Sequence, residues 1–279
     1  MASLSRSSRI LVFIAFSVAA ILFSWTGGTA AAQRPLEAQS LSNLQPQLLE
    51  RTLAELKATS TNHPQIYFVG FAGYGRQAVF KREVLAVRQL FDDRFGTKGR
   101  SVALINHRST VKEIPLADIA NLDRVLAYLG GLMDTNRDTL FLFLTSHGEE
   151  GLLAVEMPGL SLNHLRPQQL KKMLDRSRIK KRVVVVSSCH SGSFISVLAD
   201  PNTLVIAAAR ADRSSFGCED RRQWTYFGDA YFNRALRQET SFRRAFELAR
   251  QLIATWEVEE RLQPSLPQIA GGEALPEGD

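Results

Sequence analysis

Short apolar runs alternate with segments of helical periodicity through most of the chain. The apolar runs are QIYFVGFAG from Gln65, SVALIN from Ser101, TLFLFLTSHG from Thr139, RVVVVSSCHSG from Arg182 and TLVIAAAR from Thr203. Continuous apolar runs of this length, bounded by glycine or small polar residues, are typical of strands that are covered on both faces of a sheet. The pattern therefore predicts five buried strands.

The segments between these runs carry apolar residues three and four positions apart, which is the spacing of one helix face. Such spacing occurs within VFKREVLAVRQLF, from Ile119 to Met133, in PQQLKKML, and from Phe242 to Trp256. Strands that alternate with helices favour a parallel sheet with right-handed crossovers and helices on both faces. We therefore expect an α/β three-layer sandwich with a mainly parallel central sheet.

The N-terminal residues 1–32 differ from the rest. Arg6 and Arg9 precede the apolar run ILVFIAFSVAAILFSW, and the small residues of TGGTAAA follow it. This order predicts an export signal that is cleaved after Ala32, so that the protein is periplasmic or secreted. An uncleaved membrane anchor is the alternative, although the run is short for a span of about 20 residues. Beyond it we expect a helical extension over 33–64 with a helix from Leu41 to Ala58, a domain over 65–270 and a loose tail over 271–279.

Composition narrows the class of protein. A chain of 279 residues with 45% hydrophobic and 22% charged residues suits one globular domain rather than a disordered or fibrous protein. The net charge of +6 is modest, and the basic clusters LKKML and RIKKR contain no aromatic residues, so we expect solvated surfaces and no nucleic-acid partner. No C-x-x-C or H-x-x-x-H spacing occurs, and DTNRD has threonine at positions six and twelve of a calcium loop. We expect no metal and no cofactor.

Two reactive residues follow neighbouring apolar runs. His147 ends the third run and Cys189 ends the fourth. The carboxyl ends of parallel strands lie at one edge of the sheet, where a thiol and an imidazole can share a proton. Gly148 and Gly192 would let the backbone approach a substrate, and the amides of Gly148 and Cys189 suit an oxyanion hole.

Other interpretations of these residues remain open on spacing alone. His190 follows Cys189 directly and so points away from it in an extended segment. His107 also follows a strand, where a solvated loop histidine is the simpler interpretation. CHSGS lacks the G-x-S-x-G pattern of serine hydrolases. Cys189 and Cys218 are the two cysteines of an exported chain, so a disulfide between them is a further alternative to a nucleophile.

Three segments in this order resemble the legumain family of cysteine peptidases, which belongs with the caspases. They are LTSHGEEG, VVVVSSCHSGSF and ADRSSFGCEDRRQWTYFGDAYF, and the likeness extends over roughly residues 65 to 270. The resemblance implies a caspase-like fold, His147 as general base and acid, and Cys189 as nucleophile. It also implies an oxyanion hole from Gly148 and the Cys189 amide. With the N-terminal segment it suggests an exported, bacterial-type member.

The resemblance also implies a substrate pocket. Asp229 of TYFGD would line the pocket for the residue before the scissile bond, with Ser214 and Ser215 as its wall. As the nucleophile, Cys189 must remain a free thiol. We therefore interpret Cys218 as a second, partly buried thiol near the pocket. A regulatory disulfide with Cys189 is the alternative.

This sequence departs from the family pattern at several positions. Ser146 replaces an acid before the histidine, and His190 replaces a glutamate after the cysteine. The family's first-strand loop holds an asparagine and an Arg-His pair that orient the histidine and complete the pocket, and FAGYGRQAVFKRE offers no secure match to them. Arg76, Lys81 and Arg82 are candidates for that role.

Together these features predict a cysteine endopeptidase that hydrolyses peptides or proteins through a Cys-His dyad, after Asn or Asp. One alternative is a transamidase that resolves the same thioester with an amine. The other is a catalytically idle binding module of the same fold.

Overall fold

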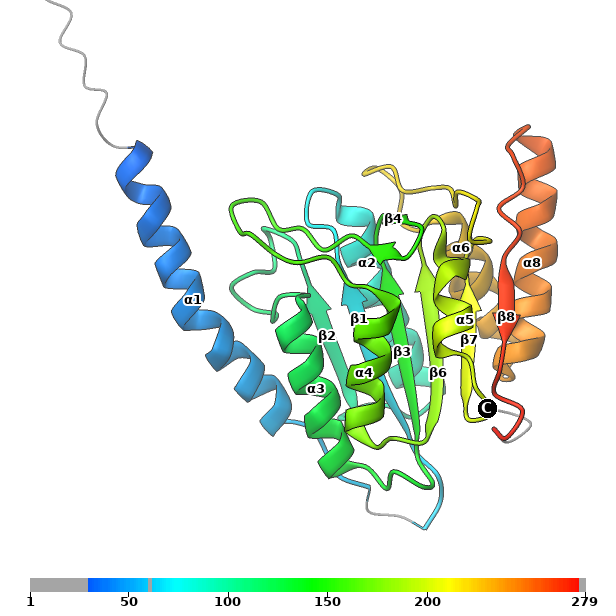
Figure 1. Ribbon diagram of the computed structural model, residues 1–279, viewed down its shortest axis with the longest axis horizontal. Coiled ribbons are helices and arrows are strands. Elements are labelled where there is room, and N and C mark those ends of the chain that lie inside the picture. The colour runs from blue at the N-terminus through cyan, green and yellow to red at the C-terminus, as the bar shows by residue number, and fades with distance from the viewer. Residues whose placement is uncertain (1–29, 60–61, 276–279) are drawn as a thin grey trace, which may run out of the picture.

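A six-stranded sheet forms the centre of the protein in a computed structural model, which describes residues 30–59 and 62–275 (Figure 1). Its order is β2 (Ser101–Ile105), β1 (Ile66–Ala72), β3 (Thr139–Thr145), β6 (Lys181–Ser187), β7 (Thr203–Ala207) and β8 (Gln268–Ala270). The first five are parallel and coincide with the five predicted strands. β8 adds an antiparallel edge next to β7, which the apolar pattern did not predict.

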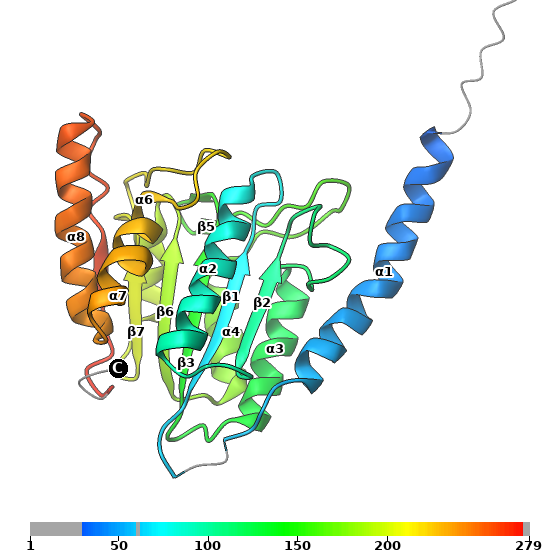
Figure 2. The same cartoon turned by 180° about the vertical axis from the view of Figure 1, so that it is seen from behind.

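Helices cover both faces of this sheet, as the alternation of strands and helices predicts. One face carries α3 (Ile119–Leu132), α4 (Pro167–Ser177) and the short α5 (Ile195–Leu198) (Figure 1). The opposite face carries α2 (Ala78–Arg94), α6 (Tyr226–Gly228), α7 (Leu236–Gln238) and α8 (Phe242–Glu259) (Figure 2). A π-helical turn, Asp229–Ala235, joins α6 to α7, and a 3-10 turn, Ser191–Phe194, precedes α5. The short hairpin β4 (Gly148–Glu149) and β5 (Leu152–Leu153) follows β3.

Two cores lie on the two faces of the sheet, because successive strand residues point to opposite sides. Leu142 and Leu144 of β3 and Val184 of β6 pack under α3 and α4. Their neighbours Phe141 and Phe143 pack under α2 and α8 instead. Both faces of each central strand are therefore buried, and this explains why the runs are apolar without alternation.

The helix α1 (Ala30–Ala54) lies on the β2 side of the sheet, beside α3 (Figure 1). Its buried residues include Leu49 and Leu53. Gln45 fastens it to the loop after β2, because its side-chain nitrogen donates to the carbonyl of Val111 at 2.7 Å and its oxygen accepts from the amide of Leu116 at 2.8 Å. The predicted helix from Leu41 to Ala58 therefore exists, but it begins earlier and ends four residues sooner.

The two ends of the chain compare differently with the sequence expectations. Residues 1–29 of the expected signal segment lie outside the described residues, and the expected cleavage point after Ala32 falls in the first turn of α1. Among the helices that the structure describes, none has the length and apolar character that crossing a membrane requires. The tail is not loose from residue 271, because the amides of Gly272 and Ala274 donate to the carbonyls of Asp200 and Pro201.

Candidate active site

His147 and Cys189 lie in one pocket at the carboxyl edge of the sheet. β3 and β6 are parallel neighbours with Thr145 opposite Ser187, so His147 and Cys189 both stand two residues past a matched pair. The pocket is narrow, with a cavity volume of about 10 Å³. The other lining residues are Phe80, Ser146, Ser187, Ser188, Ser215, Phe216, Cys218 and Thr225. The structure thus brings together the two residues that the sequence pairs.

The imidazole of His147 is held between two aromatic rings. Its ring centroid lies 4.6 Å from that of Tyr74 and 5.3 Å from that of Phe80, both nearly perpendicular to it. Its Nε2 lies 2.5 Å from Oε1 of Gln77, a residue that the sequence did not single out. Burial lowers the pKa of His147 below its usual value, and the charge of Glu156 partly opposes this. A lowered pKa favours the neutral imidazole, which is the form that acts as a base.

The sulfur of Cys189 is contacted by the backbone of the loop after β7. The amide of Ser215 donates to Sγ at 3.3 Å, and the carbonyl of the same residue lies 3.5 Å from it. Cys189 and Cys218 are both free thiols and both partly exposed. The pKa of Cys218 is raised, chiefly by burial and further by the nearby Cys189 and Glu219. Cys218 is therefore a protonated neighbour of Cys189 in the structure and not its disulfide partner.

Gly148 lies directly against the backbone of Cys189. A Cβ at position 148 would stand 2.5 Å from the carbonyl oxygen of Cys189 and 2.6 Å from Oγ of Ser188, so no larger residue fits. The main chains of Gly148 and Cys189 are thus close together, as an oxyanion hole built from their two amides requires. Gly192 differs from the sequence expectation. Its Cβ position is filled by Gln268 and the amide of Ala211, so it packs against protein instead of facing a substrate.

The implied pocket residues are only partly brought together. Ser215 lines the pocket, whereas Ser214 is exposed beside it. Asp229 is not among the lining residues, because its carboxylate accepts from Nδ2 of Asn233 at 2.7 Å and from Nε of Arg234 at 3.2 Å. Those partners are four and five residues further along the same helical segment. This position differs from the one that the TYFGD motif implied for Asp229.

The candidate basic residues brace loops around the site and do not line the pocket. Arg76 pairs with Glu156 at 3.4 Å, and Nζ of Lys81 donates to Oγ of Ser109 at 2.9 Å. Arg82 donates to the backbone carbonyl of Arg222 at 3.1 Å.

The two other histidines near the site are also held by the loops. His107 Nδ1 lies 2.8 Å from Oγ of Ser109, and His190 Nδ1 lies 2.8 Å from the carbonyl of Ala211. Neither lines the pocket of Cys189. Ser146, which replaces the family's acid, is buried and donates to the carbonyl of Ala154 at 2.6 Å.

A buried carboxyl group below the pocket joins three of its elements. Glu83 of α2 accepts from Oγ1 of Thr145 at 2.7 Å, and from the amide and the hydroxyl of Thr225 at 2.9 and 2.7 Å. Burial raises the pKa of Glu83, although the hydrogen bonds from both threonines oppose the shift. Thr145 ends the strand that leads to His147, and Thr225 lines the pocket. Glu83 therefore fixes α2, β3 and the start of α6 relative to one another.

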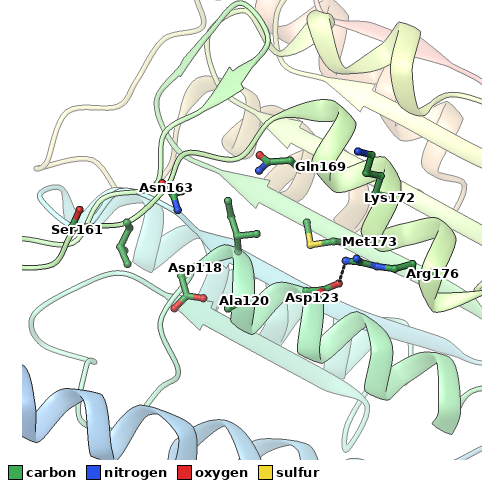
Figure 3. A pocket seen from close by; sticks show the side chains of 11 residues that line it. Asp118, Ala120, Asp123, Ser161, Asn163, Gln169, Lys172, Met173 and Arg176 are labelled. Atoms are coloured by element: carbon green, nitrogen blue, oxygen red, sulfur yellow. Dashed lines mark hydrogen bonds and ion pairs between the residues drawn. The ribbon is translucent and has the colours of Figure 1, made fainter.

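A larger hollow, with a cavity volume of about 580 Å³, lies away from this chemistry, between α3 and α4 (Figure 3). Arg176 and Asp123 form an ion pair of 2.7 Å in its wall. No cysteine or histidine is among its lining residues. The smaller pocket, which holds both the thiol and the imidazole, is therefore the candidate active site.

Comparison with known sequences points to one family. Residues 121–273 match the model of the peptidase C13 family. The chain is 32% identical to legumain of Mus musculus over 97 residues, which are 34% of this chain and 22% of that protein. It is 34% identical to hemoglobinase of Schistosoma japonicum over 106 residues, 36% of this chain and 24% of that protein. The match thus spans less than a quarter of the length of these relatives.

Comparison with solved structures supports the fold. The crystal structure of caspase-1 from Spodoptera frugiperda is similar to this one with a TM-score of 0.52 at 14% sequence identity. The similarity covers 77% of this chain and 88% of that one. The caspase-like α/β fold with a mainly parallel sheet, predicted from the sequence, is therefore confirmed.

Proposed function

Because this chain belongs to the peptidase C13 family, we propose that it is a cysteine endopeptidase with Cys189 as nucleophile and His147 as general base. The observation that carries the proposal is the parallel register of β3 and β6, which sets both residues at the same level of the sheet and in one pocket. The neutral form of His147, favoured by its lowered pKa, is the form that such a base requires.

The proposed reaction passes through a thioester. His147 takes the proton of the Cys189 thiol, and the thiolate attacks the carbonyl carbon of the peptide bond. The amides of Gly148 and Cys189 stabilise the negative charge on the oxygen of the tetrahedral intermediate. His147 then gives its proton to the leaving amine as the C–N bond breaks. Water, deprotonated by His147, attacks the thioester, releases the carboxylic acid and restores the thiol.

We propose Asn, or protonated Asp, as the preferred residue before the scissile bond. The support is a wall rich in hydroxyl groups, to which Ser187, Ser188, Ser215 and Thr225 belong. A small amide side chain can both donate to and accept from such groups, which an apolar side chain cannot do. The carboxylate of Asp229 is engaged by Asn233 and Arg234, so this preference does not depend on it.

Cleavage of a peptide library by the purified chain tests the proposal. The parent should cleave, the Cys189→Ala variant should not, and both should melt at the same temperature. The matched control is Cys218→Ser, which removes the other thiol of the same pocket. Cleavage by Cys189→Ala at the parent's rate would contradict the proposal. An inactive parent whose Cys189 fails to react with a thiol probe at neutral pH would support an idle binding module. Products that join to an added amine would support a transamidase.

We also propose that the protein is exported, on the N-terminal pattern of Arg6, Arg9 and the apolar run. N-terminal sequencing of the protein from producing cells tests this. A mature chain that begins at Gln33 agrees with a cleaved signal, whereas retention of residues 1–32 agrees with an anchor.

A further inference from the structure

We propose that Lys81, His107 and Arg108 form a subsite that binds a carboxylate of the peptide substrate. The inference rests on the proposed function, because it concerns the substrate of that reaction. The subsite combines α2 with the loop after β2 and lies outside the pocket of Cys189. It is nevertheless next to that pocket, because Lys81 directly follows Phe80, which lines the pocket.

The loop after β2 presents His107 in a fixed place. Asn106 precedes it, is buried, and donates through Nδ2 to the carbonyl of Gly73 in the loop after β1 at 2.9 Å. The carbonyl of His107 accepts from the amides of Thr110 and Val111 at 3.0 and 3.1 Å. The chain therefore turns back directly after His107 and holds this residue at the carboxyl edge of the sheet.

The hydrogen bonds of His107 leave one donor of its ring unused. The amide of Ser109 donates to Nδ1 of His107 at 3.1 Å, so Nδ1 carries no proton. Oγ of Ser109 lies 2.8 Å from the same nitrogen and accepts from Nζ of Lys81 at 2.9 Å. The proton of the neutral imidazole is therefore on Nε2, which has no hydrogen-bond partner among residues 30–59 and 62–275.

Lys81 and Arg108 add positive charge beside this donor. In the part of the chain that the structure describes, neither side chain forms an ion pair. An ammonium group has three donors, so Lys81 keeps two of them after its bond to Ser109. Burial lowers the pKa of His107, and the charges of Lys81 and Arg108 lower it further. A neutral His107 agrees with the position of its proton.

One acidic side chain lies near this cluster, and it is already engaged. The charge of Asp220 opposes the effect of burial on the pKa of Lys81, as it does for His107. Its Oδ1 accepts from the amide of Ala78 at 2.5 Å. Arg82 is a third cation near His107, and it donates to a backbone carbonyl, which carries no net charge. Three cations thus face one carboxylate, and this excess of positive charge attracts a second one.

The register of the sheet sets the cluster at the level of the catalytic histidine. Ile105 of β2 and Thr145 of β3 both lie opposite Ala72 of β1. His107 and His147 each stand two residues further along the chain. Two strand spacings, about 10 Å, separate the ends of β2 and β3. An extended peptide covers about 3.3 Å per residue, so its side chain about three residues from the scissile bond reaches the cluster.

Pairs of peptides that differ only by glutamate or glutamine at one position test the proposal. The two side chains have nearly the same shape, so the comparison isolates the charge. The parent should prefer glutamate by about five- to tenfold in kcat/KM at one position, or at two adjacent ones, about two to four residues from the scissile bond. The preference should lie in KM, because the subsite touches no reacting atom, and it should shrink in about 0.5 M sodium chloride.

Substitutions on the two elements should remove this preference. Lys81→Gln and Arg108→Gln should each reduce it to about twofold or less, and Arg108→Glu should turn it against glutamate. Lys112→Gln is the matched control, because it removes the same charge from an exposed position of the same loop. It should keep the parent's ratio. Equal melting temperatures of these variants would show that unfolding is not the cause.

Inorganic phosphate distinguishes a carboxylate of the substrate from a free anion. It should compete with the glutamate peptide and raise the KM of that peptide more than the KM of the glutamine peptide. Equal inhibition of both peptides by phosphate, without any preference for glutamate, would indicate a site for free anions and overturn the role in substrate binding.

Two further results would overturn the inference. One is the absence of a glutamate preference at every position, and the other is a preference that Lys81→Gln and Arg108→Gln both retain. Binding of the same peptides to Cys189→Ala, followed by fluorescence anisotropy, tests the subsite without catalysis. If the parent cleaves no peptide, the proposed function fails, but tighter binding of the glutamate peptide by Cys189→Ala still supports the subsite. Equal or absent binding of the two peptides contradicts it.

Discussion

Replacement of Glu83 by leucine should loosen the support beneath the active site. The two side chains have similar volume, so the variant tests hydrogen bonding more than packing. Leucine cannot accept from the hydroxyl of Thr145 or from the amide and hydroxyl of Thr225, and all of these groups are buried. The Thr225 hydroxyl, which also accepts from the amide of Gly228, keeps another acceptor within reach because Oγ of Ser187 lies 3.4 Å from it. At least two donors, the Thr225 amide and the Thr145 hydroxyl, thus lose the partner that the structure shows.

The cost follows from these two donors. A buried donor left without a partner costs about 1–3 kcal/mol, so the free energy of unfolding should fall by about 2–6 kcal/mol. At the middle of that range, about 4 kcal/mol corresponds to a fall in Tm of about 8–16 °C for a domain of this size. Because Thr145 leads to His147 and Thr225 lines the pocket, activity below the new Tm should fall as well.

The Glu83→Gln variant provides the matched control and a test of pH dependence. Its oxygen still accepts from Thr225, so its loss of stability near pH 4.5 should be small. Burial raises the pKa of Glu83, which means that the folded state holds the proton more tightly than the unfolded state. The parent therefore loses stability relative to Glu83→Gln as pH rises from the unfolded pKa of about 4.5 through the folded one.

Urea unfolding of the parent and both variants between pH 4 and 8 measures these differences. A Glu83→Leu variant within about 0.5 kcal/mol of the parent would refute the account of the buried hydrogen bonds. A gap between parent and Glu83→Gln that stays constant, or widens in the parent's favour as pH rises, would refute the raised pKa.

Three further predictions concern the pocket itself. Gly148→Ala should lower kcat by about 100-fold or more because its Cβ displaces the Cys189 carbonyl and with it the two amides, and a parent-like kcat in peptide kinetics would show that catalysis does not need this close approach. Cys218→Ser should keep activity within about twofold. Thiol titration of the unreduced parent should find two thiols, and a count of zero would reveal the disulfide form. Asp229→Ala should cost about 0.5–1 kcal/mol of stability without changing the ratio of kcat/KM for Asn and Ala peptides, and a selective loss for Asn would restore the role that the motif implies.

The strands and the placement of His147 and Cys189 in one pocket were predictable because both depend on local pattern. Apolar runs mark strands buried on two faces, and the ends of adjacent parallel strands must meet, so His147 and Cys189 share an edge whatever the loops do. β8 lacks this signal, since its three residues are only half-buried. Its pairing with β7 arises from the return of the chain after α8.

The residues that the sequence missed act through contacts between distant segments. Gln77 resembles any polar residue before a helix, and its contact is with His147, 70 residues further along the chain. The position of Glu83 was visible in the sequence, because it occupies the apolar face of α2 with Val79, Val84 and Val87. A charged residue at such a position indicates a buried partner.

Asp229 shows how far a motif reaches. A motif fixes which residue occupies a position, but the direction of its side chain depends on local competition for hydrogen bonds. Asn233 and Arg234, one helical turn further on, are the partners of its carboxylate. At Gly192 the sequence correctly predicted a close approach to the backbone. The group that approaches is the side chain of Gln268 and the amide of Ala211, and not a substrate.

Trapping of the covalent intermediate tests the central claim most directly. The full chain would be mixed with an activated ester of a peptide ending in Asn, quenched with acid, and analysed by intact and peptide mass spectrometry. The account predicts a single acyl group on Cys189, none on Cys218, and strongly slowed acylation in the His147→Ala variant. Acylation of Cys218, or of Cys189 at the rate of a free thiol with His147 present or absent, would contradict the account.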